Sequence, residues 1–294
     1  MRNRWRSIRF LLARRTVQVG VLLLFALGYR LDLKLMDREV VAGNLSGSVI
    51  LEAVPLADPF AVLQQLLAGQ SLLIDVLLGA ALVTVFYLLV GGRVFCSWVC
   101  PMNMVTDAAA WSRAKLGLPH GPSVSRRLRL GVLGLALGLS ALTGVAAFEW
   151  ISPIAMLHRE LIYGMGMAWV AAMGIFVFDA LVLRHGWCGH FCPLGAFYGL
   201  LGRFSLLRVG FVPETCTRCG ECHRVCPEPQ VLNLRQLDHT RRVLSGDCSN
   251  CGRCMEACPE GSLNFAWRFT GKLPVQASPG DDAPGRPVPE RKAS

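Results

Sequence analysis

The sequence is poor in charged residues. Asp, Glu, Lys and Arg make up only 17% of its 294 residues, whereas 53% are hydrophobic, and the mean hydropathy is +0.43. Soluble domains usually carry about 25% charged residues. The deficit disfavours a soluble globular protein and indicates a chain that is embedded in a membrane.

Acidic residues are especially scarce. The chain has 20 Asp and Glu against 30 Lys and Arg, which gives a formal net charge of +10. A basic balance of this kind can indicate a nucleic-acid-binding protein. Here the basic residues cluster beside the apolar runs, as the positive-inside rule predicts for membrane proteins. We therefore expect no nucleic acid among the partners.

Isolated cysteines are absent. All twelve cysteines fall into closely spaced groups, namely Cys96 with Cys100, Cys188 with Cys192, Cys216 to Cys226, and Cys248 to Cys258. Disulfide frameworks belong to small secreted chains, and a 294-residue chain of this hydropathy is not one. The grouping indicates metal ligation instead.

Four apolar runs approach the length of about 20 residues that a helix needs to cross a bilayer. They lie near residues 11–29, 71–90, 130–148 and 161–183. The first could be mistaken for a signal peptide, but no small-residue cleavage site follows at Tyr29, Arg30 and Leu31. We therefore expect an uncleaved anchor and an α-helical polytopic membrane protein with four transmembrane helices.

The basic residues at the ends of these runs predict an orientation. One side of the membrane would hold the basic residues of 1–15, 93–129 and 184–208, and the other only Arg30, Lys34, Arg38 and Arg159. Lys and Arg are enriched on the cytoplasmic side of membrane proteins. The N- and C-termini are therefore both predicted to be cytoplasmic, which agrees with an even number of spans.

The sequence also repeats itself. The second run is closed by Phe95-Cys96-Ser97-Trp98-Val99-Cys100-Pro101, and the fourth by Trp187-Cys188-Gly189-His190-Phe191-Cys192-Pro193, 92 residues later. Each motif follows two apolar runs and precedes a helix-like stretch. Residues 1–194 are therefore predicted to form a membrane domain of two pseudo-repeats, and residues 195–211 an interfacial helix or linker.

A two-cluster ferredoxin-like domain is predicted at residues 212–269. The pattern C-x2-C-x2-C-x3-C-P occurs there twice, at 216–227 and 248–259. In bacterial ferredoxins this spacing gives three cysteines to one 4Fe–4S cluster and the fourth to the other. Zinc is the alternative, but its four-ligand sites match the pattern less well. The predicted ligand sets are Cys216, Cys219, Cys222 and Cys258 for one cluster, and Cys248, Cys251, Cys254 and Cys226 for the other.

The two remaining cysteine pairs lie where apolar runs end. In a C-x3-C pair, positions i and i+4 lie on one face of a helix. If the two repeats pack face to face, four cysteines converge, and we predict a third iron–sulfur centre on them. Structural or redox-active cysteines without a metal are the alternative. The four residues are Cys96, Cys100, Cys188 and Cys192.

Residues 270–294 differ in composition from the rest of the chain. They contain five prolines and few apolar side chains. A segment of this kind buries too little apolar surface to offset the entropy of ordering it, so we predict a disordered tail.

Taken together, the motifs resemble those of a known family. The two C-x3-C-P motifs, the tandem cluster motifs, Asp58-Pro59-Phe60 and the segment from Ser152 to Arg159 are similar to the NapH-type membrane ferredoxins. That family is the quinol dehydrogenase membrane component of periplasmic nitrate reductase systems. The resemblance covers about residues 1–268.

The resemblance implies a function in the bacterial inner (plasma) membrane. It implies that the chain oxidises quinol from the membrane pool and delivers electrons to a periplasmic iron–sulfur protein of the NapG type. Beyond that partner it implies a cytochrome c and nitrate reductase subunits. A membrane polyferredoxin that assists metalloenzyme (oxidase) assembly or metal reduction is the alternative.

Quinol oxidation requires a proton acceptor beside a pocket that is open to the membrane. Ionisable residues in or next to spans are costly and often functional. Asp75 lies near the start of the second run, and Glu149 and His158 lie between the third and fourth. These three form the predicted quinol and proton site. The alternative for each is a residue that caps a helix or meets lipid head groups.

Overall fold

Helices make up most of the computed structural model, which describes residues 8–30, 34–35, 38–39, 41–118, 121–122, 124–164 and 166–269. The mostly helical fold that the sequence predicts is confirmed, and the predicted tail at 270–294 lies outside the described residues. The α-helices are α1 (Arg9–Arg30), α2 (Pro59–Leu67), α3 (Ile74–Val90), α4 (Met102–Lys115), α5 (Leu128–Thr143), α6 (Ala147–Ile151), α7 (Pro153–Tyr163), α8 (Ala168–Leu181), α9 (Pro193–Gly202), α10 (Glu221–Val225), α11 (Leu234–Thr240) and α12 (Arg253–Ala257). The strands are β1 (Lys34–Leu35), β2 (Arg38–Glu39), β3 (Val41–Asn44), β4 (Gly47–Ile50), β5 (Val54–Ala57), β6 (Leu207–Phe211) and β7 (Leu263–Trp267), and the short helical turns are η1 (Phe95–Val99), η2 (Trp187–Phe191), η3 (Pro213–Thr215) and η4 (Pro229–Val231).

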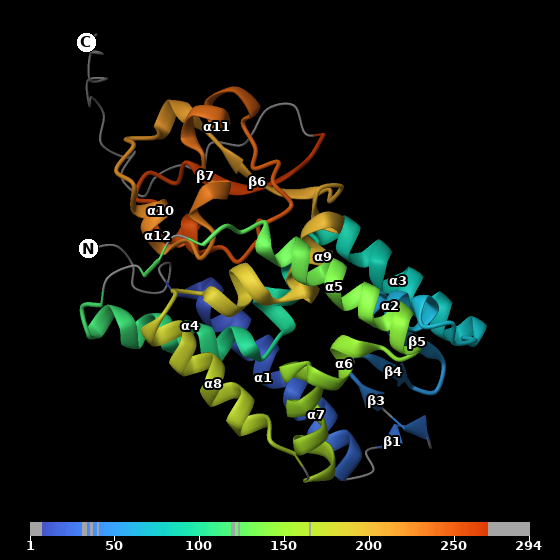
Figure 1. Ribbon diagram of the computed structural model, residues 1–294. Coiled ribbons are helices and arrows are strands. Elements are labelled where there is room, and N and C mark those ends of the chain that lie inside the picture. The colour runs from blue at the N-terminus through green and yellow to red at the C-terminus, as the bar shows by residue number, and fades with distance from the viewer. Residues whose placement is uncertain are drawn as a thin grey trace.

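The ferredoxin-like part and the small sheet lie at opposite ends of the molecule (Figure 1). The elements β6, β7, α10, α11 and α12, coloured orange to red, gather at one end. The antiparallel strands β3, β4 and β5 lie at the other end, and the helical body lies between them. The start of α1 meets the ferredoxin-like end, because Glu256 Oε1 accepts the N–H of Phe10 at 2.6 Å. The beginning of α1 and the cluster domain are therefore on the same side of the helical body.

Each of the four predicted runs contains one apolar helix, namely α1, α3, α5 and α8. Among the described residues, only α1 is long and apolar enough, over Arg9–Gly28, to cross a membrane. The helices α3, α5 and α8 have 17, 16 and 14 residues. At 1.5 Å per residue, they are about 20–25 Å long, shorter than a typical hydrocarbon core of about 30 Å. The predicted number of four spans is therefore not confirmed.

The third and fourth predicted runs extend beyond the helices that they contain. Gly144 ends α5 in a left-handed conformation with φ of +71°, so residues 147 and 148 belong to α6. Gly164 ends α7 in the same way with φ of +67°, so the run at 161–183 is divided between α7 and α8. Glycine adopts this conformation without penalty and commonly ends helices. The sequence remains apolar on both sides of Gly144 and of Gly164, so its composition does not reveal that helices end there.

The predicted interfacial helix at 195–211 also differs from the structure. Helix α9 covers only Pro193–Gly202 and is mostly buried, with Leu194, Ala196 and Tyr198 all at most 5% exposed. Residues 207–211 form strand β6, which pairs antiparallel with β7 in the register Leu207 with Trp267. Several apolar residues of this stretch are therefore buried in the protein, whereas Phe204 is 68% exposed.

The internal repeat is longer than the cysteine motifs indicate. Each half has a short helix, an apolar helix, a motif turn and a following helix: α2, α3, η1 and α4 in the first, and α7, α8, η2 and α9 in the second. The short helices α2 and α7 both begin with an N-cap residue followed by proline, two features that are common at the start of helices. The cap of α2 is Asp58, which accepts the N–H of Phe60 at 3.3 Å, and the cap of α7 is Ser152. The first half thus has a carboxylate where the second has a hydroxyl.

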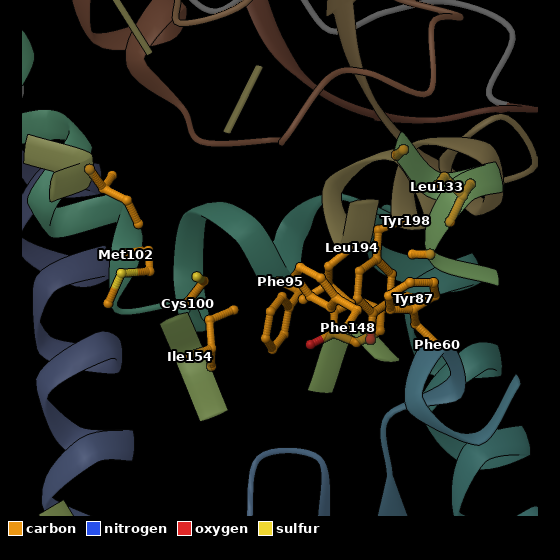
Figure 2. Close-up of a cluster of buried hydrophobic side chains, with 13 residues drawn as sticks. Phe60, Tyr87, Phe95, Cys100, Met102, Leu133, Phe148, Ile154, Leu194 and Tyr198 are labelled. Atoms are coloured by element: carbon orange, nitrogen blue, oxygen red, sulfur yellow. The ribbon is translucent and has the colours of Figure 1, made fainter. Parts of the chain in front are cut away.

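Aromatic side chains fill the junction between the two halves (Figure 2). The rings of Phe95 and Tyr198 stack at a centroid distance of 5.4 Å, and Tyr87 meets Tyr198 edge-on at 5.0 Å. Phe60 belongs to the same buried cluster. Burying one such side chain stabilises a fold by about 1.5–3 kcal/mol. Because Phe95 belongs to the first motif and Tyr198 to the helix after the second, this packing holds the two motifs together.

Candidate metal centres

Both C-x3-C-P motifs form the same kind of turn. The turns η1 and η2 are π-helical: the N–H of Cys100 donates to the carbonyl of Phe95, and that of Cys192 to the carbonyl of Trp187, both at 2.9 Å. Single π-turns are rare and are frequent at functional sites. Because the turn is wider than an α-helical one, it places residues four apart on the same side.

The two turns bring their four cysteines together. Cys188 and Cys192 lie close enough to Cys96 and Cys100 for the charge of one thiolate to raise the pKa of another. Burial and then the neighbouring Cys96 raise the pKa of Cys192 to about 11. Such thiols are poorly ionised by themselves, whereas a bound metal takes them as thiolates. The all-sulfur donor set fits an iron–sulfur centre.

Four cysteines of the ferredoxin-like domain line one small cavity. They are Cys216, Cys219 and Cys222 of the first tandem motif and Cys258 of the second. This is the crosswise set that the spacing predicts for one cluster, and its donors suit a 4Fe–4S cluster. The cavity supports the predicted ligand assignment.

The other four cysteines lie around a second position. Cys226 is near Cys248 and Cys251, and Cys254 is near all three. Burial, with the neighbouring cysteines, raises the pKa of both Cys226 and Cys254. Within the described residues, no three His, Cys, Asp or Glu side chains have the spacing of ligands to a single metal ion.

The two tandem cluster loops have the same backbone conformation. Arg218 and Asn250, the third residue of each motif, have φ of +55° and +48°. Gly220 and Gly252 follow with +78° and +77°, values that glycine adopts without steric cost. At Gly252 the ring of Phe10 comes so close that an added Cβ would lie 2.4 Å from it. Glycine at this position therefore lets α1 pack on the second loop.

The second tandem loop also lies directly on the first C-x3-C-P turn. Ser97 Oγ donates to the carbonyl of Ser249 at 2.7 Å, and Trp98 Nε1 donates to the carbonyl of Asn250 at 3.1 Å. Asn250 Nδ2 donates in turn to the carbonyl of Val90, at the end of α3, at 3.0 Å. These bonds fix the cysteines of the second tandem motif next to Cys96 and Cys100. Because Cys96, Cys100, Cys188 and Cys192 follow the predicted spans, we call them the membrane-edge cysteines.

A buried ion network reinforces this contact. Glu228 Oε1 accepts from Arg93 Nη1 at 2.8 Å and lies 3.7 Å from Arg129 Nη1, and its other oxygen pairs with Arg126. Arg129 also pairs with Asp247. Arg93 and Glu228 are only 3% and 5% exposed, and charges at this depth are stable only when they are paired. Sequence analysis did not single out Glu228, because nothing local shows that three distant arginines meet it.

The three residues predicted for quinol chemistry lie in two places. Asp75 and Glu149 line one cavity of about 870 Å³ beside β3 to β5, where Glu149 accepts a hydrogen bond from Ser46 Oγ at 2.7 Å. His158 lies elsewhere, 2% exposed, with its ring 5.3 Å from that of Phe25. In the described part of the chain, neither ring nitrogen of His158 has a hydrogen-bond partner. The structure thus brings Asp75 and Glu149 together and leaves His158 apart.

Sequence analysis missed a second pair of polar side chains. Tyr198 Oη donates to Asp58 Oδ1 at 2.8 Å, and both residues line a cavity of about 210 Å³. Asp58 belongs to a segment that carries the family resemblance, and this was the only signal in the sequence. Tyr198 gives no sign in the sequence that it meets a residue 140 positions away.

Two family models match the sequence. A model described as a 4Fe-4S binding domain matches residues 72–119 and again residues 165–211, so each match contains one C-x3-C-P motif. A model described as a 4Fe-4S dicluster domain matches residues 208–259, which contain both tandem motifs. The two predicted 4Fe–4S clusters are thereby confirmed.

Several known proteins are similar to most of the chain. The methylamine utilization ferredoxin-type protein MauN of Methylorubrum extorquens is 45% identical over 248 residues, which is 83% of each chain. MauN of Methylobacillus flagellatus is 47% identical over 76% of this chain and 78% of the relative. The ferredoxin-type protein NapH of Escherichia coli is 42% identical over 80% of each chain. No solved structure is significantly similar to the chain.

Proposed function

Because the chain belongs to the family of NapH and MauN ferredoxin-type proteins, we propose that it takes electrons from a membrane quinol and passes them towards a periplasmic oxidoreductase. It is an iron–sulfur electron-transfer protein with two 4Fe–4S clusters. The quinol, the four spans of a bacterial inner membrane, the cytoplasmic termini and the acceptor are the parts that we propose. The residues that the sequence predicts for the quinol and proton site are His158, Glu149 and Asp75.

The contact between the first C-x3-C-P turn and the second tandem loop carries this proposal. A quinol gives up two electrons, whereas each cluster accepts one, so the oxidant must be a series of one-electron centres. The hydrogen bonds from Ser97 and Trp98 to the loop keep two cysteine groups adjacent. We propose that a third centre at the four membrane-edge cysteines stands between a quinol in the helical body and the tandem clusters.

Arg93 is the residue that positions these groups relative to one another. Its Nη1 donates to the carbonyl of Asp247 at 3.0 Å, and its Nη2 donates to the carbonyl of Cys188 at 3.2 Å. One guanidinium therefore ties the second membrane-edge turn to the second tandem loop. Its positive charge also offsets the negative charge that thiolates bring to a cluster.

Two acceptor systems are candidates. Two ferredoxin-type NapH proteins are each 42% identical to this chain. For a chain of this type we propose a periplasmic iron–sulfur partner of the NapG type, with cytochrome c and nitrate reductase beyond it. The MauN relatives, named for methylamine utilization, are 43–47% identical and support a methylamine-utilization system instead. A strain that lacks this chain distinguishes them, since it loses either periplasmic nitrate reduction or growth on methylamine. If both persist and an oxidase lacks its metal, the assembly alternative is correct.

Quinol is expected to reduce the clusters of the purified protein. A short-chain benzoquinol or naphthoquinol is mixed anaerobically with the full chain in lipid vesicles, and the reduced clusters are followed by electron paramagnetic resonance. Reduction should appear with quinol and remain absent with the corresponding quinone. If quinol reduces no cluster in the protein or in its reconstituted partner, while dithionite reduces the clusters, the quinol proposal is wrong.

The proposed third centre predicts the iron content. Two cubanes hold about eight irons per chain and three hold about twelve, so the purified protein should contain about twelve. The double variant Cys188→Ser/Cys192→Ser should contain about eight, because it lacks two of the four membrane-edge thiolates. Iron and acid-labile sulfide analysis measures both. About eight irons in the unaltered chain would leave these cysteines without a cubane.

A further inference from the structure

We propose that the quinol ring binds in the cavity between α1, α3 and the β3–β4–β5 sheet, with a ring hydroxyl on the Asp58–Tyr198 pair. This inference rests on the proposed quinol function and states where in the protein the oxidation takes place. It assigns the proton-accepting role to Asp58 rather than to Asp75, Glu149 or His158.

The cavity has the size and lining that a quinol ring needs. Its volume is about 210 Å³. A dry cavity of about 150 Å³ takes up benzene, so a substituted six-membered ring fits and an isoprenoid tail stays outside. The walls include Val21 and Leu24 of α1 and Val83 of α3. Leu24 is also 39% exposed, so this wall of the cavity extends to the surface of the protein.

Asp58 and Tyr198 supply the polar contact in this otherwise mainly apolar lining. The phenol donates to Oδ1 of the carboxylate at 2.8 Å, and the backbone N–H groups of Phe60 and Ala61 donate to the same carboxylate as helix-cap bonds. A carboxylate has about four lone-pair sites, so one remains to accept from a ligand hydroxyl. Burial raises the pKa of Asp58 to about 7, and the hydrogen bond from Tyr198 opposes the rise. A base whose pKa is near the working pH is an effective proton acceptor.

The same cavity adjoins the first membrane-edge cysteine turn. Phe95 and Val99, which flank Cys96 and Cys100 in the sequence, both line it. Phe95 also stacks on Tyr198 (Figure 2). A ring on the Asp58–Tyr198 pair would therefore be in contact with side chains next to the cysteines of the proposed third centre.

The internal repeat provides a comparison within the chain. The second half has a corresponding cavity of about 440 Å³, whose walls include Ile175, Trp187 and Phe191 at the positions of Val83, Phe95 and Val99. That cavity has no ionisable side chain in its lining. Of the two cavities beside the cysteine turns, only the first combines a ring-sized apolar space with a proton acceptor.

The cavity of Asp75 and Glu149 does not adjoin either cysteine turn. Its lining comes from the strands β3 to β5 and the helix ends near Gln70 and Trp150, and no residue of either cysteine turn takes part. A quinol there would be separated from the cysteines by the body of α3.

The reaction at the proposed site balances as follows. The bound quinol loses two O–H protons and two electrons and leaves as quinone. Asp58 accepts one proton and releases it to water, and it then accepts and releases the second in the same way. The two electrons pass one at a time to oxidised iron–sulfur centres, each of which is reduced by one electron and then reoxidised by the periplasmic partner.

Asp58→Asn tests the assignment. Asparagine caps a helix as well as aspartate does, so α2 keeps its start while the proton acceptor is lost. We expect reduction of the clusters by a short-chain quinol to slow by about 100-fold or more, measured by stopped-flow absorbance of the full chain in vesicles. Reduction by dithionite, which needs no quinol site, and the iron content should not change. Tyr198→Phe should give a smaller loss, because the carboxylate remains.

Matched variants separate the possible outcomes. Glu52→Gln, at an exposed position in the turn between β4 and β5, should leave the rate unchanged. If quinol reduces the unaltered protein and Asp58→Asn equally fast, the inference is overturned and the quinol function stands. The same holds if Asp75→Asn or Glu149→Gln abolishes the reaction and Asp58→Asn does not. If quinol fails to reduce the unaltered protein, the proposed function itself fails.

Discussion

Replacing Cys258 by alanine is expected to remove the same cluster as replacing Cys216, although the two residues belong to different motifs. Each single variant should lose about four irons per chain. The double variant Cys216→Ala/Cys258→Ala should lose no more than either single variant, because both residues line one cavity and bind one cluster. Iron analysis and the cluster signals in electron paramagnetic resonance measure the loss.

A second double variant provides the contrast. Cys216→Ala/Cys226→Ala should lose about eight irons, because Cys226 lies among the cysteines of the second set although it stands in the first motif. The iron losses from replacing two ligands of the same cluster are not additive, whereas the losses from replacing ligands of separate clusters add. If Cys216→Ala/Cys226→Ala loses only one cluster and Cys216→Ala/Cys258→Ala loses two, each motif holds its own cluster and the crosswise assignment is wrong.

Replacing Glu228 by glutamine is expected to destabilise the contact between the helical body and the ferredoxin-like domain. The variant keeps the shape of the side chain but leaves Arg93, Arg126 and Arg129 without the carboxylate that they share. Removing one partner of a buried ion pair typically costs about 3–5 kcal/mol, because the remaining charge is buried and unpaired. The midpoint of thermal unfolding in detergent should fall, and hydrogen exchange at residues 245–252 should rise.

Glu214→Gln is the matched control for this prediction. Glu214 pairs with Arg241 at 2.6 Å at an exposed site of the same domain, and exposed ion pairs contribute little to stability. Its unfolding midpoint should therefore stay close to that of the unaltered protein. Equal midpoints for Glu228→Gln and the unaltered chain would show that the network does not hold the two parts together.

The tandem motifs illustrate what local spacing can reveal. A cluster loop depends on residues that are neighbours in the sequence, since three cysteines within seven residues must wrap one cubane. The loop also needs a left-handed residue, and glycine supplies it at 220 and 252. The sequence therefore predicts the clusters and the pairing of motifs directly. The helix ends at Gly144 and Gly164 also depend on local residues, but apolar composition outweighed them in the prediction of spans.

The membrane-edge cysteines required one further step. The sequence shows two pairs at equivalent positions of a repeat, and a repeat suggests that the halves face each other. In the folded chain, the packing of Phe95 on Tyr198 and the bond from Arg93 to the carbonyl of Cys188 help to bring the pairs together. The predicted convergence depended on symmetry, and the structure supplies the contacts that produce it.

The sequence by itself determined the two 4Fe–4S clusters, the repeat and the family, because each of them is recognised from short motifs of neighbouring residues. Tertiary structure alone decided which side chains Asp58, Tyr198 and Glu228 meet. Asp58 and Tyr198 are 140 positions apart, and Glu228 and Arg93 are 135 apart. A carboxylate gains a role only from the groups that surround it, since burial and its partners set both its charge and its stability. No local pattern encodes those surroundings, so these residues are recognisable only in the folded chain.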